Sequence, residues 1–291
     1  MSEKAMADLF ARHEKIIGSL DSPRKAPEAL LVVCMDERTA LTEEALGLDP
    51  SRVFRFASGG GKIEADDFVA LFGKRLVSMP ADSRRVLLAT HEVVGHPDLG
   101  CAAFKNDIAE QERYFLALRR ALAGRLGDVP VHALCTDTST DAARPIEIDP
   151  RDDSELAARI AAGIGPQREA PKIEGHAGRG IYVGEAYRAW VSDRNDFFHI
   201  NADAPSLRGD LDIALSVMLH HSAVRPDADH PLILHVDYPE GGDIRPESRG
   251  KIDAAVDSFL SCPDAQRLKT DGLLCVVRTA TDIGNWSAQL L

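Results

Sequence analysis

The sequence alternates short runs of β-branched and other apolar residues with longer stretches whose apolar residues recur at helical spacing. Residues 30–34 (LLVVC) are typical of a buried strand. Residues 66–77 have the periodicity of an amphipathic helix, with an acidic first turn that suits the helix dipole. Strands that alternate with helices pack as layers around a largely parallel sheet. We therefore predict an α/β fold.

The predicted strands and helices form two series of similar order. The first series has strands at 30–34, 52–56, 85–90 and 129–136 and helices at 66–77, 104–126 and 154–162. The second series has strands at 180–184, 196–202, 231–237 and 272–277 and helices at 210–220 and 249–260. CTDTSTD at 135–141 corresponds to RTATD at 278–282, and FRFAS at 54–58 to FHINA at 198–202. We predict an internal duplication of about 130 residues.

This duplication divides the chain into three predicted parts. Residues 1–28 form an N-terminal helical arm, residues 29–150 a first domain, and residues 151–291 a duplicated second domain. Each domain is long enough for a core of its own.

The charge balance and the cysteines exclude several classes of protein. The chain carries 34 Lys and Arg against 46 Asp and Glu, a net charge of −12, so we expect no nucleic-acid partner. The apolar run at 29–35 is much shorter than the roughly 20 residues of a membrane span, and residues 1–25 lack a signal-peptide core. Five widely spaced cysteines do not form a disulfide framework, which predicts reduced thiols and a cytoplasmic location.

The first predicted strand ends in the motif Cys34-Met-Asp36-Glu-Arg38. Alternation along an extended segment would direct Cys34, Asp36 and Arg38 to one side. Strand ends of open α/β sheets are the usual place for ligands. Taken alone, the motif fits a core cysteine followed by a surface salt bridge equally well.

Two further side chains complete a candidate metal-ligand set. His91 ends a neighbouring predicted strand, and Cys101 follows at the predicted start of a helix. Two thiolates and one imidazole suit zinc and leave the fourth tetrahedral position for water, whereas structural zinc sites usually have four ligands. His96 is an alternative to His91, but we interpret it as a solvent-facing loop residue. The three remaining cysteines are interpreted as buried small hydrophobic residues: Cys135, Cys262 and Cys275.

The second series lacks this ligand set. Aligning the two series pairs Cys34 with Gly184, Asp36 with Ala186, Arg38 with Arg188, and His91 with Asp237. The hydrophobic pattern is kept while the metal-ligating residues are not. The sequence therefore predicts a single site, in the first domain.

On these residues the chain resembles the carboxysome shell carbonic anhydrase family, a divergent branch of the β-carbonic anhydrases. The matching stretches are VVCMDER at 32–38, VLLATH at 86–91, GCAA at 100–103, CTDTSTD at 135–141, EGHA at 174–177, DLDIA at 210–214 and LHVDY at 234–238. The resemblance spans both halves, from about residue 28 to about residue 285. One departure is that the segment from His91 to Cys101 is a residue shorter than in the family.

The resemblance implies two fused β-carbonic-anhydrase-like domains, of which only the first binds zinc. Cys34, His91 and Cys101 would be the ligands, with Asp36 and Arg38 as a catalytic dyad beside the metal. The implied activity is reversible hydration of CO2 to bicarbonate, and the implied assembly is a homodimer. The helical domain of the shell enzyme has no counterpart in the roughly 28 residues before the first strand, which argues against carboxysome packaging.

Two other functions stay open at this point. One is a zinc hydrolase of the same fold that acts on CS2 or COS, and the other is a non-enzymatic protein that binds zinc or inorganic carbon. Other motifs are set aside. HEVVGH at 91–96 has one residue too many for a zinc-protease helix, because its two histidines would lie about 140° apart. SGGGK at 58–62 is followed by Ile63, where a phosphate loop needs Ser or Thr.

Overall fold

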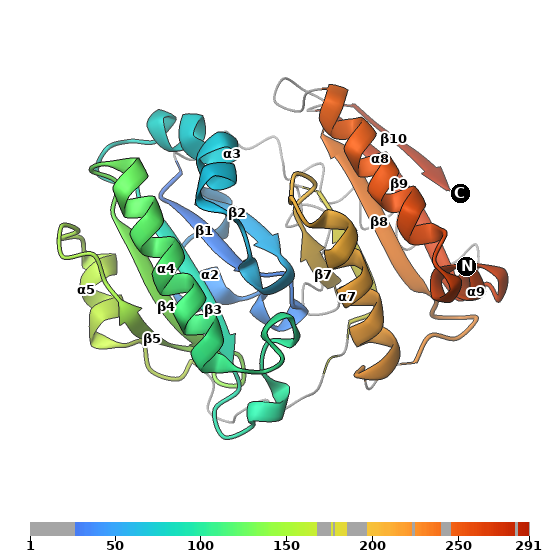
Figure 1. The fold of residues 1–291 in the computed structure, drawn as a ribbon, viewed down its shortest axis with the longest axis horizontal. Coiled ribbons are helices and arrows are strands. Elements are labelled where there is room, and N and C mark those ends of the chain that lie inside the picture. Colours follow the sequence, from blue (N-terminus) through green and yellow to red (C-terminus); the bar gives the residue numbers. More distant parts are fainter. Residues whose placement is uncertain are drawn as a thin grey trace. The chain divides into compact units, whose positions relative to one another are not determined.

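The computed structural model describes residues 27–167, 176, 178–184, 197–222, 225–239, 246–282 and 285–290. The chain divides into two compact units, which are described separately. The first unit is Arg24–Gly175, and the second contains His176–Leu291. Each unit has its own five-stranded sheet with helices packed on it (Figure 1), so the predicted α/β fold with parallel sheets is confirmed.

The sheet of the first unit has the strand order β2-β1-β3-β4-β5. The strands are β1 (Ala29–Cys34), β2 (Val53–Ser58), β3 (Val86–Glu92), β4 (Val131–Asp137) and β5 (Ala142–Glu147). The first four are parallel, and β5 pairs with β4 antiparallel. Because β1 and β3 lie side by side, their carboxyl ends bring Cys34 and His91 to the same edge of the sheet.

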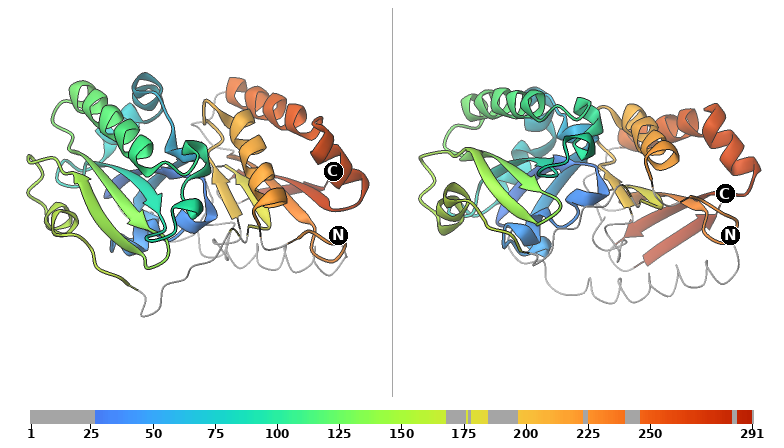
Figure 2. Two further views of the ribbon diagram at one scale, coloured as in Figure 1. Left: turned by 60° about the horizontal axis from the view of Figure 1, so that its bottom comes forward. Right: turned by 90° about the horizontal axis from the view of Figure 1, so that it is seen from below.

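Helices cover both faces of this sheet (Figure 2). The long helices α3 (Ala65–Ser78) and α4 (Ile108–Leu126) lie on one face, and the short α2 (Thr42–Ala45) and α5 (Glu155–Ala162) lie on the other. On the face toward α2 and α5, a continuous apolar core joins residues of all five strands, among them Leu31, Val33, Leu87 and Leu134. Strands buried on both faces read as unbroken apolar runs, which explains why residues 30–34 were recognisable in the sequence.

The second unit repeats this strand order as β7-β6-β8-β9-β10. Its strands are β6 (Gly180–Val183), β7 (Phe197–Ile200), β8 (Leu232–Pro239), β9 (Leu274–Asp282) and β10 (Asn285–Leu290). Four strands are again parallel, and the last strand is again antiparallel. The helices of this unit include α7 (Leu207–His220), α8 (Pro246–Leu260) and α9 (Pro263–Thr270).

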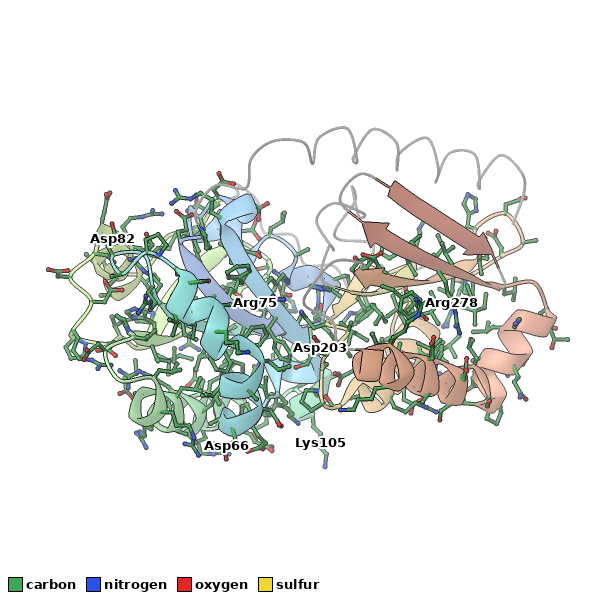
Figure 3. All side chains as sticks on the ribbon, turned by 90° about the horizontal axis from the view of Figure 1, so that it is seen from above. Asp66, Arg75, Asp82, Lys105, Asp203 and Arg278 are labelled. Atoms are coloured by element: carbon green, nitrogen blue, oxygen red, sulfur yellow. The ribbon has the colours of Figure 1, made fainter. Side chains whose placement is uncertain are left out.

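One predicted helix begins later than expected. The prediction started it at residue 104, whereas α4 begins at Ile108. Lys105, which projects from the turn in Figure 3, and Asn106 have positive φ values of 52° and 63°, which interrupt a right-handed helix. Asp107 then caps α4, since its carboxylate accepts a hydrogen bond from Glu110 N at 2.9 Å.

Some predictions fall outside the described residues. The N-terminal arm at 1–28 is described only at its last two positions, and Ala186 and Arg188 are not described. Among the helices that the structure describes, none is long and apolar enough to span a membrane.

Candidate metal centre

The end of β1 is shaped by a tight turn. Asp36 precedes a short 3-10 helix, η1 (Glu37–Thr39), and the Thr39 hydroxyl donates to the carbonyl oxygen of Cys34 at 2.9 Å. The prediction that the segment stays extended from Cys34 to Arg38 is therefore wrong, because the chain turns after Met35. Asp36 Oδ1 accepts a hydrogen bond from Arg38 N within this turn at 3.0 Å, and Asp36 Oδ2 lies 3.9 Å from His91 Nε2.

Arg38 holds Asp36 in a two-pronged ion pair. Its Nε donates to Asp36 Oδ1 at 2.9 Å and its Nη2 to Oδ2 at 2.7 Å, a geometry that fixes the carboxylate in one orientation. The same guanidinium donates to the carbonyl oxygens of Leu99 at 2.6 Å and Gly100 at 3.3 Å. Burial would lower the pKa of Arg38, but the adjacent Asp36 carboxylate raises it above its ordinary value. Arg38 thus joins Asp36 to the residues that directly precede Cys101.

His91 is the most unusual polar side chain of the first sheet. It lies near the end of β3, is completely buried, and neither ring nitrogen has a hydrogen-bond partner among the described residues. Asp36 Oδ2 lies 3.9 Å from His91 Nε2. A buried polar atom without a partner costs about 1–3 kcal/mol. Such an imidazole is what a metal site requires, because a metal ion takes one of the ring nitrogens.

Cys101 completes a group of three ligand atoms. Its Sγ lies 3.6 Å from Cys34 Sγ, and the ligand atoms of Cys34, His91 and Cys101 all lie within 4.8 Å of one another. Two thiolates on one tetrahedral zinc ion, each at about 2.3 Å, would have sulfurs about 3.8 Å apart. The three side chains therefore form a group that could hold a metal ion, and their nitrogen and sulfur donors fit zinc.

The two thiols form a coupled pair. The hydrogen bond to Cys101 raises the pKa of Cys34 and burial raises it further, whereas the hydrogen bond from Cys34 lowers the pKa of Cys101. The Cys101 thiol therefore loses its proton more readily than the Cys34 thiol. A divalent metal favours the deprotonated form of both thiols, so binding at this group releases protons.

The glycines after β2 support the segment that carries Cys101. Gly60 and Gly61 have positive φ values of 69° and 68°, and a Cβ on Gly60 would lie 2.6 Å from the Phe104 ring. Lys62 Nζ, at the end of this run, donates to the carbonyl oxygen of Ala103 at 2.8 Å. The glycine run therefore permits close packing against residues 101–104.

The CTDTSTD stretch at 135–141 supports the preceding loop. Asp137 ends β4, and its carboxylate accepts hydrogen bonds from the Ser139 hydroxyl and the Thr140 hydroxyl, both at 2.7 Å, and from Val94 N at 3.4 Å. Burial alone would raise the pKa of Asp137, but the hydrogen bonds from Ser139 and Thr140 lower it. Asp137 therefore stays ionised and anchors the loop between His91 and Cys101.

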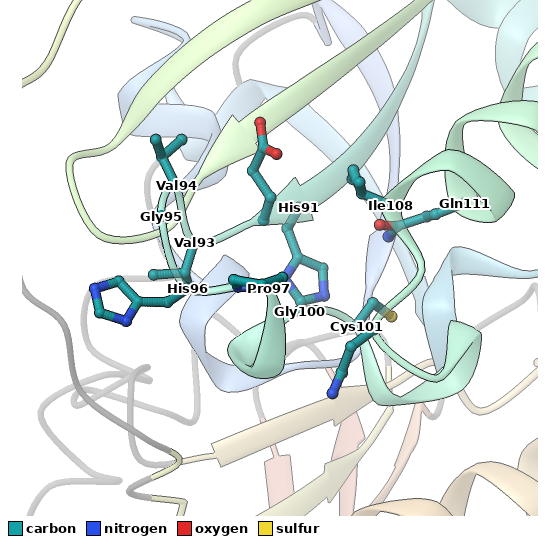
Figure 4. A pocket seen from close by; sticks show the side chains of 12 residues that line it. His91, Val93, Val94, Gly95, His96, Pro97, Gly100, Cys101, Ile108 and Gln111 are labelled. Carbon is teal, nitrogen blue, oxygen red and sulfur yellow. The ribbon is translucent and has the colours of Figure 1, made fainter.

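A cavity of about 160 Å³ opens beside the metal-ligand group (Figure 4). Besides His91 and Cys101, its lining includes the apolar side chains of Val93 and Ile108. His96 also lines it, but the His96 ring points away from His91 in Figure 4, and His96 does not belong to the three-residue group. The structure thus brings His91, and not His96, to the two thiols.

Sequence reasoning missed Gln111, which also lines this cavity. Gln111 is buried on the face of α4 that carries Phe115, Leu118 and Leu122. The signal was available in the sequence, because helical spacing places Gln111 on one face with Phe115, Leu118 and Leu122.

The carboxyl end of the second sheet carries a different arrangement. Asp237 in β8 accepts hydrogen bonds from the Tyr182 hydroxyl at 2.9 Å and the Thr279 hydroxyl at 2.7 Å, and His235 Nε2 contacts Thr279 Oγ1 at 2.9 Å. The described residues of the second unit do not, by themselves, form any group of three metal-ligating side chains.

The other cysteines lie apart from the metal-ligand group. Cys135 and Cys275 are buried, as predicted, and burial raises the pKa of Cys135 to about 12. Cys262, the residue directly before α9, is only half-buried, so its assignment to the core is wrong.

Comparisons with known proteins give limited likenesses. No protein-family model matches the sequence, and no curated protein matches it. Among solved structures, the chain is similar to β-carbonic anhydrase isoform I of the protozoan Trichomonas vaginalis, with 16% identity, a TM-score of 0.37, and coverage of 51% of this chain and 99% of that one. It is also similar to the Coccomyxa β-carbonic anhydrase in complex with acetazolamide, with 15% identity, a TM-score of 0.32, and coverage of 49% and 82%. With TM-scores this low, neither likeness carries weight for the activity of this chain.

Proposed function

We propose that this chain is a zinc-dependent carbonic anhydrase that reversibly hydrates CO2 to bicarbonate at a single site in its first unit. One observation carries the proposal: Cys34, His91 and Cys101 form a buried group beside the Asp36 carboxylate, and the His91 ring nitrogens have no hydrogen-bond partner among the described residues. Zinc held by such donors supplies a Lewis acid that lowers the pKa of water from 15.7 toward about 7, which is the chemistry that CO2 hydration needs.

The roles of the ligating residues follow from their donor chemistry. Cys34 and Cys101 would hold zinc as thiolates, and His91 as a neutral imidazole. A set of two sulfurs and one nitrogen suits zinc better than magnesium or calcium, which prefer oxygen ligands.

Asp36 and Arg38 would orient the water at the metal-ligand group. Asp36 accepts hydrogen bonds from Arg38 at both carboxylate oxygens, and its Oδ2 faces His91 at 3.9 Å. From this position Asp36 would accept a hydrogen bond from the reacting water and aim its oxygen at CO2. Arg38 is a positioning residue, since its two-pronged pair keeps Asp36 from turning toward the ligand group itself. The apolar lining by Val93 and Ile108 suits an uncharged substrate such as CO2.

The proposal includes an origin by duplication, with the metal site kept in the first domain (29–150) and lost from the second (151–291). Support comes from the identical strand order of the two sheets and from Asp237, which lies in β8 where His91 lies in β3. The sequence resemblance to the carboxysome shell enzyme extends the proposal to a homodimer that acts on CO2 and bicarbonate.

The direct test is stopped-flow CO2 hydration by zinc-loaded protein beside the Asp36→Ala variant. We expect one zinc per chain in both proteins, rapid hydration by the wild type, and a rate at least about a hundredfold lower in the variant. A wild-type protein that binds zinc but does not hydrate CO2 would contradict the proposal. In that case, assays with COS and CS2 would separate a hydrolase from a protein that only binds zinc.

A further inference from the structure

A buried amide group points into the cavity beside the metal-ligand group. Gln111 lies in the first turn of α4 and is only 1% exposed, and its Nε2 has no hydrogen-bond partner among the described residues. Figure 4 shows its carboxamide directed toward the space that His91 and Cys101 also line.

The position of Gln111 is one that packing alone would fill with an apolar residue. Phe115, Leu118 and Leu122 continue the same buried face of α4. A buried N–H group without an acceptor destabilises the fold, whereas a leucine of similar size would not. An unpartnered donor that faces a cavity is therefore better explained by a ligand than by packing.

We infer that Gln111 Nε2 donates a hydrogen bond to an oxygen atom of bicarbonate in this cavity, and that it selects oxygen over sulfur substrates. An amide N–H can only donate, so its ligand must present an acceptor. The oxygens of bicarbonate are strong acceptors, and the charge of the anion strengthens the bond. Sulfur is a weak acceptor, so the dithiocarbonate formed from CS2, which has a single oxygen atom, would satisfy this donor less well than bicarbonate, which has three.

This inference rests on the proposed CO2 hydration and names the residue that sets its substrate class. A buried donor discriminates between ligands because a ligand with fewer oxygen acceptors leaves it poorly paired. The donor therefore separates a carbonic anhydrase from a CS2 hydrolase, which the ligand set alone would allow.

The test measures bicarbonate binding by calorimetry on zinc-loaded protein. Gln111→Leu removes the amide and keeps the approximate volume, while Gln111→Glu replaces the donor with a carboxylate of the same shape. Leu122→Met, on the same buried face of α4 and outside the cavity, is the matched control. Zinc content and the thermal unfolding midpoint are measured for every variant.

We expect Gln111→Leu to weaken bicarbonate binding by about ten- to a hundredfold, because it removes a hydrogen bond to a charged ligand. Gln111→Glu should bind bicarbonate still more weakly, since two anions would then meet. Zinc content should equal that of the wild type in all variants. The unfolding midpoint of Gln111→Leu should rise by about 2 °C, because the unpartnered amide is gone. In turnover, the preference for CO2 over CS2 should fall about tenfold.

Three results would overturn the inference. These are unchanged bicarbonate affinity in Gln111→Leu, no bicarbonate binding by the zinc-loaded wild type, and loss of zinc from Gln111→Leu with retention in Leu122→Met. The last result would mean that Gln111 orients the ligands instead. Failure of the proposed function looks different: the wild type would bind bicarbonate through Gln111 and yet not accelerate CO2 hydration.

Discussion

The carboxyl ends of the two sheets both carry buried polar residues, but the hydrogen bonding of these residues differs. In the first unit, His91 is buried beside two thiols, and its ring nitrogens have no hydrogen-bond partner among the described residues. In the second unit, Asp237 is equally buried and accepts hydrogen bonds from Tyr182 and Thr279. The two residues lie in strands with the same place in the strand order, β3 and β8.

This difference shows how one strand order can serve two purposes. A polar group whose hydrogen bonds are satisfied by its neighbours stabilises the fold and has no capacity left for a ligand. A group left without partners costs stability, and that cost is recovered when a ligand binds. The carboxyl end of the first sheet therefore fits a binding site, and that of the second sheet fits a structural network. Variants in either unit can test this contrast.

The largest effect is expected from removing a thiol of the metal-ligand group. Cys101→Ala leaves two ligands, so zinc content after dialysis should fall from about one per chain to background. Cys135→Ala is the matched control, because it removes a buried thiol outside the group and should leave zinc content unchanged. Metal analysis by mass spectrometry checks both variants. Equal zinc in the two variants would place the metal elsewhere.

The next effect concerns Arg38, which contacts both Asp36 and the backbone before Cys101. Arg38→Ala should reduce CO2 hydration by about a hundredfold or more, because Asp36 loses its fixed orientation. Zinc should still bind at saturating concentration, with affinity lowered about tenfold as the Leu99 and Gly100 carbonyl contacts are lost.

Arg278 of the second unit is the control for this variant, because it too is an arginine held in ion pairs, in its case with the carboxylates of Asp253 and Asp257. Arg278→Ala should leave CO2 hydration and zinc content unchanged. Equal decreases of the stopped-flow rate in the two arginine variants would contradict the proposal that only the first unit carries the site.

A smaller effect, on stability, is expected from removing one hydrogen-bonding group near Asp237 in the second unit. Thr279→Val removes the hydroxyl that donates to Asp237 and contacts His235. The buried carboxylate loses a donor, so the free energy of unfolding of this unit should fall by about 2–3 kcal/mol, measured by urea denaturation. Zinc content should not change. A loss of zinc in this variant would show that zinc binding in the first unit depends on the hydrogen-bond network of the second unit.

The smallest effect depends on pH. Asp137→Asn removes the charge that accepts hydrogen bonds near the loop of the first unit, and should lower the free energy of unfolding by about 1–2 kcal/mol at neutral pH. The pKa of Asp137 is lowered in the folded protein, so its stabilisation is present above the ordinary Asp pKa of about 4 and is lost as the pH falls through the lower, folded value. Unfolding measured from pH 8 to pH 3.5 should show a constant difference between wild type and variant that begins to narrow only below about pH 4. A difference that grows on acidification would contradict this assignment.

Much of the fold could be predicted because its central strands are buried on both faces. Unbroken apolar runs identified β1 and β3, and amphipathic periodicity identified α3 and α7. The antiparallel β5 was missed, since an edge strand needs no such run and this one contains Arg144 and Pro145. Helix α9 was missed because only Ala265 and Leu268 of its short sequence are buried.

The site could be predicted only in part. Residue types and strand ends indicate which side chains lie close together, but they do not indicate the hydrogen bonds that orient those side chains. Cys34 and His91 end neighbouring strands, so their proximity followed from the predicted topology. The bonds from Arg38 to the Leu99 and Gly100 carbonyls depend on the path of the loop, which no periodicity encodes. Gln111 could not be predicted as a site residue, because the sequence does not show which face of α4 lines the cavity.

The three candidate ligands come from separate parts of the chain, and the two thiols are 67 residues apart. No short fragment could therefore capture the ion, and a growing polypeptide must wait until Cys101 has emerged from the ribosome and docked against the first sheet. Metal binding would then occur late in biosynthesis, after the first unit has folded. The free energy of metal binding would afterwards stabilise that unit against unfolding.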